Sequence, residues 1–301
     1  MAKKESINKL EKMRMILNRP GVGVGVGAGD ALCAKLIEEA GFDFIWSSSL
    51  CVSCSFAVPD ANLISMSQYC EVARNMNEVV SIPIIADCDT GYGNVNNLIY
   101  AMKKFEEAGI AGISIEDKKF PKDNSLLEGG RQELASIKEF VGKIKAAKDL
   151  QKNDEFVVIA RVEALIAGWG QKEAMERAHS YVDAGADCIL IHSKSKTPDE
   201  ILEFVIKWDQ EVPLVLVPTN YPSLTFKAIE DLKKVKLVIC ANQPLRAAVK
   251  AQEKLLKEIK RLGGIHDIDS MMVPVSHLFD LQGVPAMKEN EKKYMENNEE
   301  I

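Results

Sequence analysis

The chain has 301 residues, with 38 Lys and Arg against 44 Asp and Glu, and its formal net charge is −6. A content of 47% hydrophobic and 27% charged residues is typical of a globular protein with a substantial core, and it excludes wholesale disorder. The mildly acidic balance gives no electrostatic reason to expect binding to nucleic acid or to an anionic membrane. An anionic ligand must therefore be held by local cations or by a metal ion.

The N-terminal segment, MAKKESINKLEKMRMILNRPG, alternates charged and apolar residues at helical spacing. This pattern predicts a helix over about residues 4–17 and lacks the unbroken apolar core of a signal peptide. No segment approaches the roughly 18 consecutive apolar residues of a membrane-spanning helix. The seven cysteines are odd in number and scattered, which is typical of reduced thiols, so we expect a cytoplasmic protein.

Eight short apolar runs recur along the chain, and segments with helical periodicity follow them. They predict strands at 22–28, 43–48, 83–89, 112–117, 156–163, 188–194, 214–219 and 237–242. Helical patterns lie between them, for example at 30–40, 98–108, 173–184 and 244–261. The runs show little polar alternation, as expected of strands buried on both faces. The pattern predicts an α/β fold, a closed (β/α)8 barrel of the TIM type, with an open doubly wound sheet as the alternative.

A repeated phrase supports the barrel. EEAGFDFIW at 38–46, EEAGIAGISIED at 106–117 and VDAGADCILIH at 182–192 each join the end of a helix to a buried strand. No shift in composition marks a second domain, so we expect residues 1–301 to form one barrel domain with a C-terminal helical tail over about 265–301. The glycine-rich run GVGVGVGAGD lacks the GK[ST] of a phosphate-binding loop and is interpreted as the first strand.

The polar residues that end the predicted strands are mostly acidic. They include Asp87, Asp89, Glu116, Asp117 and Glu163. In a parallel barrel these strand ends meet at one rim, where converging carboxylates repel one another unless a cation neutralises them. Oxygen ligands suit a hard divalent ion, so we expect Mg²⁺, with Mn²⁺ as a possible substitute. The alternative is that Asp87 and Asp89 only cap the turns before Gly91 and Gly93.

Arg161 and His192 also end apolar strands. The guanidinium of Arg161 either pairs with a barrel carboxylate or binds a substrate carboxylate or phosphoryl group. His192 is either a hydrogen-bonded structural residue or a site residue. The loop KKFPKDNSLLEGGRQEL at 118–134 is long, charged and glycine-tipped. It is interpreted as a lid whose lysines, Lys118, Lys119 and Lys122, could hold an anion, although most charged loops are only solvated.

Four segments together resemble the phosphoenolpyruvate mutases of the isocitrate lyase and phosphoenolpyruvate mutase superfamily. They are IIADCDTGYGN, GISIEDKKFPKDNS, VVIARVEALIAGWG and LIHSK. The resemblance runs from about residue 20 to beyond 280. The motif ADxDTGYGN marks the whole superfamily, whereas EDKxFPKxNS is specific to a much smaller group within it. It implies a Mg²⁺-dependent phosphomutase that interconverts phosphoenolpyruvate and 3-phosphonopyruvate, with a role in making carbon–phosphorus bonds for phosphonate biosynthesis.

The same resemblance implies three sets of site residues. The metal residues are Asp87, which binds the ion directly, with Asp89 and Glu116, which help to hold its waters. The substrate-binding residues are Ser48, Ser49, Leu50 and Arg161. The catalytic residues are Asp60, Lys122, Asn124, Arg161 and His192. In this pattern Lys122 and Asn124 reach the substrate with the lid.

Related enzymes set the alternatives. Lyases of the superfamily carry Cys-Gly-His where this chain has Lys122, Asp123 and Asn124, so carbon–carbon lysis lacks its expected acid. Phosphonopyruvate hydrolase shares the fold and the metal but has threonine in place of Asn124, so Asn124 favours the mutase. A barrel that binds an oxo-acid without turnover is the alternative from another class.

Two positions depart from the family pattern, which commonly has glycine at Ser49 and histidine at Gly29. A positive φ at Ser49 would cost more than at glycine. Relatives form dimers and tetramers by exchanging the last barrel helix. We therefore expect a helix-swapped homodimer or homotetramer whose other partner is its small-molecule substrate, with neither nucleic acid nor membrane as a partner.

Overall fold

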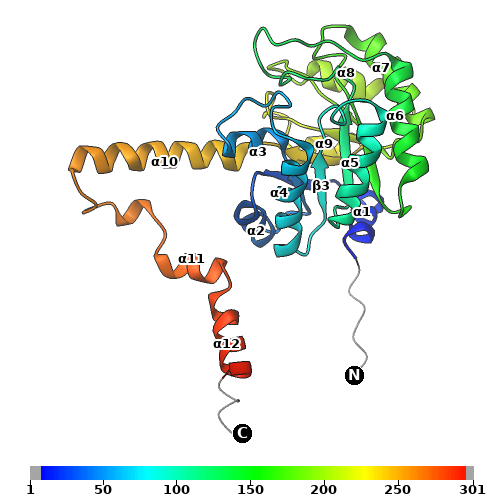
Figure 1. The fold of residues 1–301 in the computed structure, drawn as a ribbon. Helices are drawn as coiled ribbons and strands as arrows, with labels where there is room; N and C mark the ends of the chain where they lie inside the picture. The colour runs from blue at the N-terminus through cyan, green and yellow to red at the C-terminus, as the bar shows by residue number, and fades with distance from the viewer. Residues whose placement is uncertain (1–7, 296–301) are drawn as a thin grey trace. The chain divides into compact units, whose positions relative to one another are not determined.

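The computed structural model describes residues 8–295, and its centre is a closed barrel of eight parallel strands ringed by helices (Figure 1). The strands are β1 (Gly23–Ala28), β2 (Phe44–Ser47), β3 (Ile84–Asp87), β4 (Gly112–Glu116), β5 (Val157–Val162), β6 (Cys188–Ile191), β7 (Leu214–Leu216) and β8 (Val235–Cys240). Each strand pairs with the next in sequence, and β8 pairs with β1 to close the sheet. The predicted (β/α)8 barrel is confirmed.

Helices alternate with the strands as the periodicity predicts. They are α1 (Lys9–Asn18), α2 (Ala31–Glu39), α3 (Ser49–Ser55), α4 (Met66–Val79), α5 (Val95–Glu107), α6 (Ile137–Leu150), α7 (Gly170–Asp183), α8 (Asp199–Lys207), α9 (Phe226–Asp231), α10 (Gln243–Leu262), α11 (Val275–Leu281) and α12 (Val284–Met295). A short 3-10 helix at Asp269–Met271 precedes α11. None of the helices between residues 8 and 295 is long and apolar enough to cross a bilayer.

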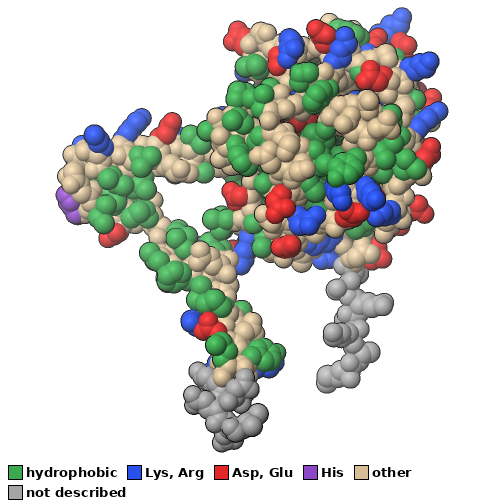
Figure 2. Space-filling model, viewed as in Figure 1, with side chains coloured by type: hydrophobic (Ala, Val, Ile, Leu, Met, Phe, Trp, Pro, Cys, Tyr) green, Lys and Arg blue, Asp and Glu red, His purple; other side chains and the backbone are tan. Residues whose placement is uncertain are grey.

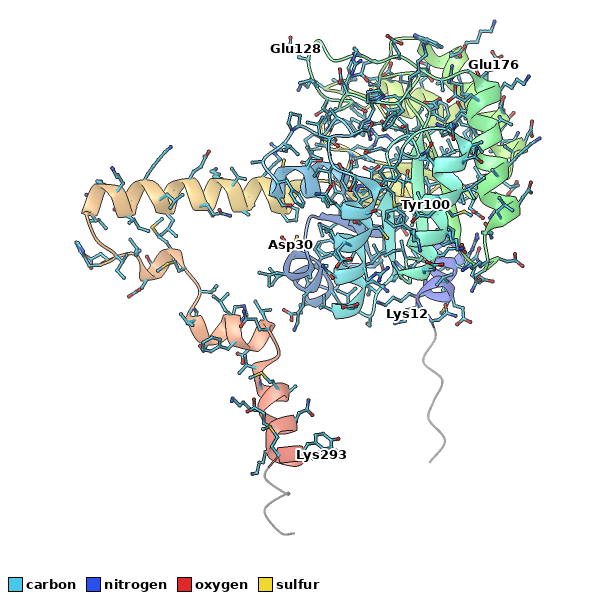
Figure 3. All side chains as sticks on the ribbon, viewed as in Figure 1. Lys12, Asp30, Tyr100, Glu128, Glu176 and Lys293 are labelled. Atoms are coloured by element: carbon cyan, nitrogen blue, oxygen red, sulfur yellow. The ribbon has the colours of Figure 1, made fainter. Side chains whose placement is uncertain are left out.

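The N-terminal helix α1 begins at Lys9, where Asn8 and Glu11 form a capping box. Residues 4–7 of the predicted helix lie outside the described residues. Its buried side chains, Met13, Ile16 and Leu17, belong to the same core cluster as residues inside the barrel. Figure 3 places Lys12 of this helix and Glu128 of the loop after β4 at opposite ends of the barrel. The loop at 118–134 therefore lies at the end away from α1.

The alternating glycines of β1 are a packing requirement. A Cβ on Gly25 would lie 2.2 Å from the Phe44 ring, and one on Gly27 would lie 1.9 Å from the carbonyl oxygen of Ala241. Neighbouring strands therefore approach β1 too closely for any larger residue at these positions. The glycine-rich run is a strand, as interpreted from the sequence.

Several predicted runs extend past the strands that form. The runs 83–89, 188–194 and 214–219 contain strands that end at Asp87, Ile191 and Leu216. Beyond Asp87 the backbone turns, and Asp89 has a left-handed φ of 49°. The strand predicted over 83–89 therefore ends at Asp87, and Asp89 lies in the following turn and not on the same strand face as Asp87.

Residues 246–301 form a second compact unit, of which the part to residue 295 is described. The predicted tail at 265–301 contains α11 and α12, and its last residues, 296–301, lie outside the described residues. None of the side chains of α10, α11 and α12 is buried. Figure 2 shows hydrophobic side chains exposed along this segment. Leu256, Val275 and Phe279 are among the exposed hydrophobic residues.

Candidate active site

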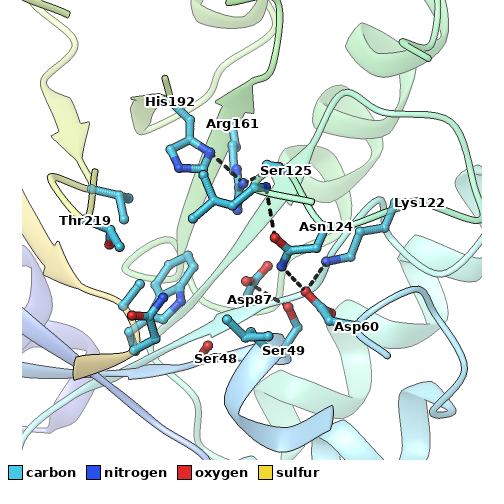
Figure 4. Close-up of a pocket in the computed structure, with 16 residues that line it drawn as sticks. Ser48, Ser49, Asp60, Asp87, Lys122, Asn124, Ser125, Arg161, His192 and Thr219 are labelled. Carbon is cyan, nitrogen blue, oxygen red and sulfur yellow. Dashed lines mark hydrogen bonds and ion pairs between the residues drawn. The ribbon is translucent and has the colours of Figure 1, made fainter. Parts of the chain in front are cut away.

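A cavity opens at the carboxyl ends of the strands (Figure 4). The predicted site residues that line it are Ser48, Ser49, Leu50, Asp60, Asp87, Lys122, Asn124, Arg161 and His192. The other two predicted residues, Asp89 and Glu116, are buried and do not line the cavity. The barrel thus brings residues that are more than 140 positions apart in sequence to one rim, where a small anion could contact several of them.

The three predicted metal residues come from adjacent strand ends. Asp87 ends β3, Glu116 ends β4, and the turn at Asp89 connects them through its backbone. The Glu116 amide donates a hydrogen bond to the Asp89 carbonyl (2.7 Å), and the Asp89 amide donates to Asp87 Oδ1 (3.3 Å). Asp87 Oδ2 also accepts a hydrogen bond from the Ser49 hydroxyl (3.1 Å). These contacts place the three residues together at the β3–β4 edge of the cavity.

The carboxylates are neutralised by cations of the chain itself. Within residues 8–295, no three His, Cys, Asp or Glu side chains are arranged to hold a metal ion. Instead, Lys122 Nζ lies 2.9 Å from Asp89 Oδ1, and Arg161 Nε lies 3.4 Å from Glu116 Oε2. The predicted metal site therefore stays a prediction, and in this structure the carboxylates contact cations of the chain itself.

The donor set nevertheless fits a hard divalent ion. All three residues offer only carboxylate oxygens, and Glu116 Oε1 is buried and accepts no hydrogen bond. Burial raises the pKa of Asp87, and burial raises the pKa of Asp89 to about 7 although the Lys122 ammonium opposes that shift. Repulsion among the neighbouring carboxylates adds to both shifts, which is the condition that a bound cation relieves.

The lid, residues 118–134, is held at the cavity by two side chains that donate hydrogen bonds to the same carboxylate oxygen. Lys122 Nζ (2.8 Å) and Asn124 Nδ2 (2.7 Å) both donate to Asp60 Oδ2. Asn62 adds a third contact, because its Oδ1 accepts the Lys122 amide (2.8 Å). Burial opposes the ionisation of Asp60, but the Lys122 charge and the donated hydrogen bonds hold its pKa below the usual value. Asp60 is therefore an anion that anchors the lid (Figure 4).

A second cluster joins the lid to β5 and β6. Glu163 Oε1 accepts hydrogen bonds from Arg161 Nε (2.5 Å), and Glu163 Oε2 accepts one from the Ser125 hydroxyl (2.6 Å). Arg161 Nη2 donates to Ser125 Oγ and to His192 Nδ1, both at 2.9 Å. His192 Nδ1 also lies 3.2 Å from Glu163 Oε1, so this ring nitrogen contacts both the guanidinium and the carboxylate. Arg161 thus pairs with a barrel carboxylate while it also lines the cavity.

His192 should make the stability of the protein depend on pH. Burial, followed by the Arg161 charge, lowers the pKa of His192 below its ordinary 6.5. The unfolded chain then binds this proton more tightly than the folded chain does. The free energy of unfolding should therefore fall as pH drops below 6.5, by at most about 1.4 kcal/mol per pH unit from this residue. Denaturant titrations should show this additional loss in the wild type relative to His192→Gln, and equal losses in both proteins would contradict it.

The lysines of the lid have separate roles that the sequence did not distinguish. Lys118 is buried and donates to Ser125 Oγ (2.6 Å) and to the Asp123 carbonyl (3.0 Å), 3.2 Å from Glu163. Lys119 is exposed and pairs with Glu133 on the surface. Only Lys122 lines the cavity. Lys122 therefore faces the cavity, whereas Lys118 is buried beside Ser125 and Lys119 is solvated, which is the alternative given for a charged loop.

The two departures from the family pattern have structural explanations. Ser49 is the first residue of α3 and is not among the residues with positive φ, so its Cβ causes no backbone strain. A Cβ at Gly29 would lie 2.8 Å from the Cys51 carbonyl oxygen. A histidine at position 29 would therefore require the start of α3 to move.

Several cavity or lid residues were not predicted as site residues. They are Asn62, Lys118, Ser125, Glu163, Thr219 and Asn242. Ser125 lies within the KDNS motif and Glu163 ends an apolar run, so both carried a sequence signal. Thr219 and Asn242 end the predicted strands 214–219 and 237–242, so they carried the same positional signal as Glu163. Thr219 Oγ1 and Asn242 Oδ1 are buried without a hydrogen-bond partner, and both residues line the cavity.

Comparison with known proteins gives consistent matches over nearly the whole chain. The model of a family described as phosphoenolpyruvate phosphomutase matches residues 14–260, which include every residue that lines the cavity. A phosphonopyruvate hydrolase from Variovorax sp. (strain Pal2) is 50% identical over 289 residues, covering 96% of this chain and 100% of the relative.

Two solved structures are similar in fold and sequence. A phosphoenolpyruvate phosphomutase from Streptomyces platensis subsp. rosaceus has a TM-score of 0.93 at 44% identity, covering 95% of this chain and 99% of the other. A phosphonopyruvate hydrolase in complex with oxalate and Mg²⁺ has a TM-score of 0.91 at 48% identity, covering 96% and 100%. Both kinds of enzyme thus have the same barrel fold as this chain and match it over nearly their whole length.

Proposed function

Because the chain belongs to the phosphoenolpyruvate phosphomutase family, within the isocitrate lyase and phosphoenolpyruvate mutase superfamily, we propose that it interconverts phosphoenolpyruvate and 3-phosphonopyruvate. The observation that carries this proposal is the position of Asn124, whose amide closes onto Asp60 beside Lys122 and so covers the cavity. A covered cavity suits a mutase, because the pyruvate enolate must receive the phosphoryl group before water reaches either reactant.

The chain's residues would bind the substrate and stabilise charge. In the mutase reaction a phosphoryl group moves between the enol oxygen and C3 of one pyruvate skeleton, through a loose transition state that needs positioning more than a strong nucleophile. Arg161 and Lys122 would supply positive charge to the substrate, and the α3 turn at Ser48 and Ser49 would contact its oxygens. No cysteine lines the cavity among the described residues, which disfavours lysis by a cysteine acid.

Asp87, Asp89 and Glu116 would hold Mg²⁺, or Mn²⁺ as a substitute, and the ion would act as a Lewis acid on the pyruvoyl oxygens. This part of the proposal is supported by the oxygen-only donor set and by the similarity to a hydrolase whose complex contains oxalate and Mg²⁺. A role in forming carbon–phosphorus bonds would follow from the mutase activity, with a downstream step that consumes phosphonopyruvate.

Phosphonopyruvate hydrolase is the second candidate, and a 50% identical relative with that name favours it. A hydrolase would break the same carbon–phosphorus bond but admit one water to the phosphorus. Asn124 distinguishes the two, because the resemblance places threonine at this position in hydrolases.

Phosphorus NMR of the purified protein with phosphonopyruvate and Mg²⁺ tests the proposal directly. A phosphoenolpyruvate signal is expected, whereas inorganic phosphate with pyruvate would establish the hydrolase, and an unchanged spectrum would indicate a binding protein. Asn124→Ala should lower the mutase rate by at least about a hundredfold, because a group positioned at the phosphoryl end is lost. Asn124→Thr should produce phosphate as a larger share of the product. A wild-type rate in Asn124→Ala would contradict the assigned role of the lid.

We also propose that the chain forms a homodimer or homotetramer by exchanging its last barrel helix. The proposal is supported by the amphipathic helix α10, which has no buried side chain in the single chain, and by its exposed Val249 and Leu256. The α11 residues Leu278 and Phe279 are also exposed. The cytoplasmic location stays a prediction.

A further inference from the structure

The tip of the lid is fastened to itself by an acidic side chain. Asp123 Oδ2 accepts a hydrogen bond from the Arg131 backbone amide (2.8 Å), and the Arg131 guanidinium lies 3.4 Å from both carboxylate oxygens. The segment between these two residues is therefore a closed loop, in which Gly129 and Gly130 directly precede Arg131. The carboxylate is placed by a backbone contact, which does not depend on the exposed guanidinium.

Three hydrogen bonds fix the carbonyl group and the side-chain oxygen of Asn124, the next residue. Gln132 Nε2 donates to the Asn124 carbonyl (3.2 Å), and so does the Leu127 amide (3.1 Å). The Leu126 amide donates to Asn124 Oδ1 (2.9 Å), which fixes the orientation of the side-chain amide. Only Nδ2 remains, and it donates to Asp60 at 2.7 Å. The contacts of Asp123, Arg131 and Gln132, which we call the brace, thus aim Asn124 at the cavity.

We infer that the brace is a positioning element that determines whether the phosphoryl group leaving C3 of phosphonopyruvate is transferred to the enol oxygen of the same skeleton or to water. The inference rests on the proposed function, in which Asn124 covers the reacting groups. When the brace is intact, the carbon–phosphorus bond breaks as the oxygen–phosphorus bond forms within one substrate. When Asn124 is free to move away, a water oxygen can bond to the phosphorus instead. One water proton then ends on C3 of the enolate, and the products are pyruvate and phosphate.

The chain offers a graded set of variants. Asp123→Ala removes both carboxylate oxygens that Arg131 contacts, Asp123→Asn keeps one oxygen for the Arg131 amide, and Arg131→Ala removes only the exposed guanidinium. Lys119→Ala is the matched control, because it removes an exposed ion pair with Glu133 in the same loop. Exposed pairs contribute little, so Arg131→Ala should have a smaller effect than Asp123→Ala.

Phosphorus NMR measures the partition between products in each variant. Asp123→Ala should lower the mutase rate by about tenfold or more and raise the share of inorganic phosphate by about tenfold, since small displacements of a positioned group are costly. Asp123→Asn should recover most of the wild-type partition, and Lys119→Ala should match the wild type. A lower rate with an unchanged product ratio in Asp123→Ala would overturn the inference.

Hydrogen exchange gives a readout that does not require turnover. The Leu126 and Leu127 amides, which donate to Asn124, should exchange at least about tenfold faster in Asp123→Ala than in the wild type, while the amides of the barrel strands stay unchanged. Unchanged exchange rates at both leucine amides would contradict the role of the brace in holding Asn124, whether the enzyme is a mutase or a hydrolase. If the wild type releases only pyruvate and phosphate, the mutase proposal fails, and the exchange result still decides whether the brace holds the lid.

Discussion

Asp87→Ala is expected to abolish turnover, with a loss of at least about a thousandfold, because the carboxylate proposed to bind the ion directly is removed and Lewis-acid stabilisation is worth several kcal/mol. Asp87 ends β3 at the cavity, and Ser49 and the Asp89 amide are its hydrogen-bond partners. Neither partner becomes a buried unpaired charge when Asp87 is removed. The barrel should therefore fold, and the loss should lie in the chemistry.

The measurement is the rate of conversion of phosphonopyruvate with saturating Mg²⁺, together with Mg²⁺ binding by calorimetry. Asp87→Ala should lose both, and its thermal unfolding should stay close to that of the wild type. Asp209→Asn is a suitable control, since its side chain is 67% exposed and pairs with His179 outside the cavity. A variant that retains Mg²⁺ binding and a rate near wild type would rule out Asp87 as a metal ligand.

Lys122→Met should lower kcat by at least about a hundredfold, because one ammonium fastens the lid and is proposed to supply positive charge to the phosphoryl group. In the wild type this ammonium lies 2.8 Å from Asp60 and 2.9 Å from Asp89, and all three groups are buried. Burial opposes the charge on Lys122, but these carboxylates raise its pKa well above the usual value. Lys122 therefore stays protonated across the pH range of any assay.

The matched control is Lys119→Met, which changes an exposed lysine of the same loop. Its rate should equal that of the wild type. Lys122→Met is also expected to expose the lid to proteases, because the anchor at Asp60 is lost. A rate in Lys122→Met within about threefold of wild type would remove this residue from the site, since loss of one preorganised charge should cost far more.

The barrel could be predicted from sequence because its information is local. Each strand is a short apolar run and each helix a periodic segment, and eight such pairs leave one economical closed arrangement. The cores of all eight predicted runs form strands, and their errors are at the ends, as at Asp89. The turn at Asp89 is fixed by hydrogen bonds with Glu116 and Asp87, and the pattern of apolar residues in the sequence does not reveal these contacts.

The fold, the family and most of the residues at the rim could be predicted from the sequence alone. Each of these signals, a strand end or a specific motif such as EDKxFPKxNS, lies within a short continuous stretch of residues. Only the tertiary structure decided how those residues are paired. Lys122 meets Asp60 across 62 positions and Ser125 meets Glu163 across 38, while Thr219 and Asn242 complete the cavity without any motif. The physical reason is that hydrogen bonds and ion pairs depend on distances of about 3 Å, which are fixed only when the lid and the strands pack together.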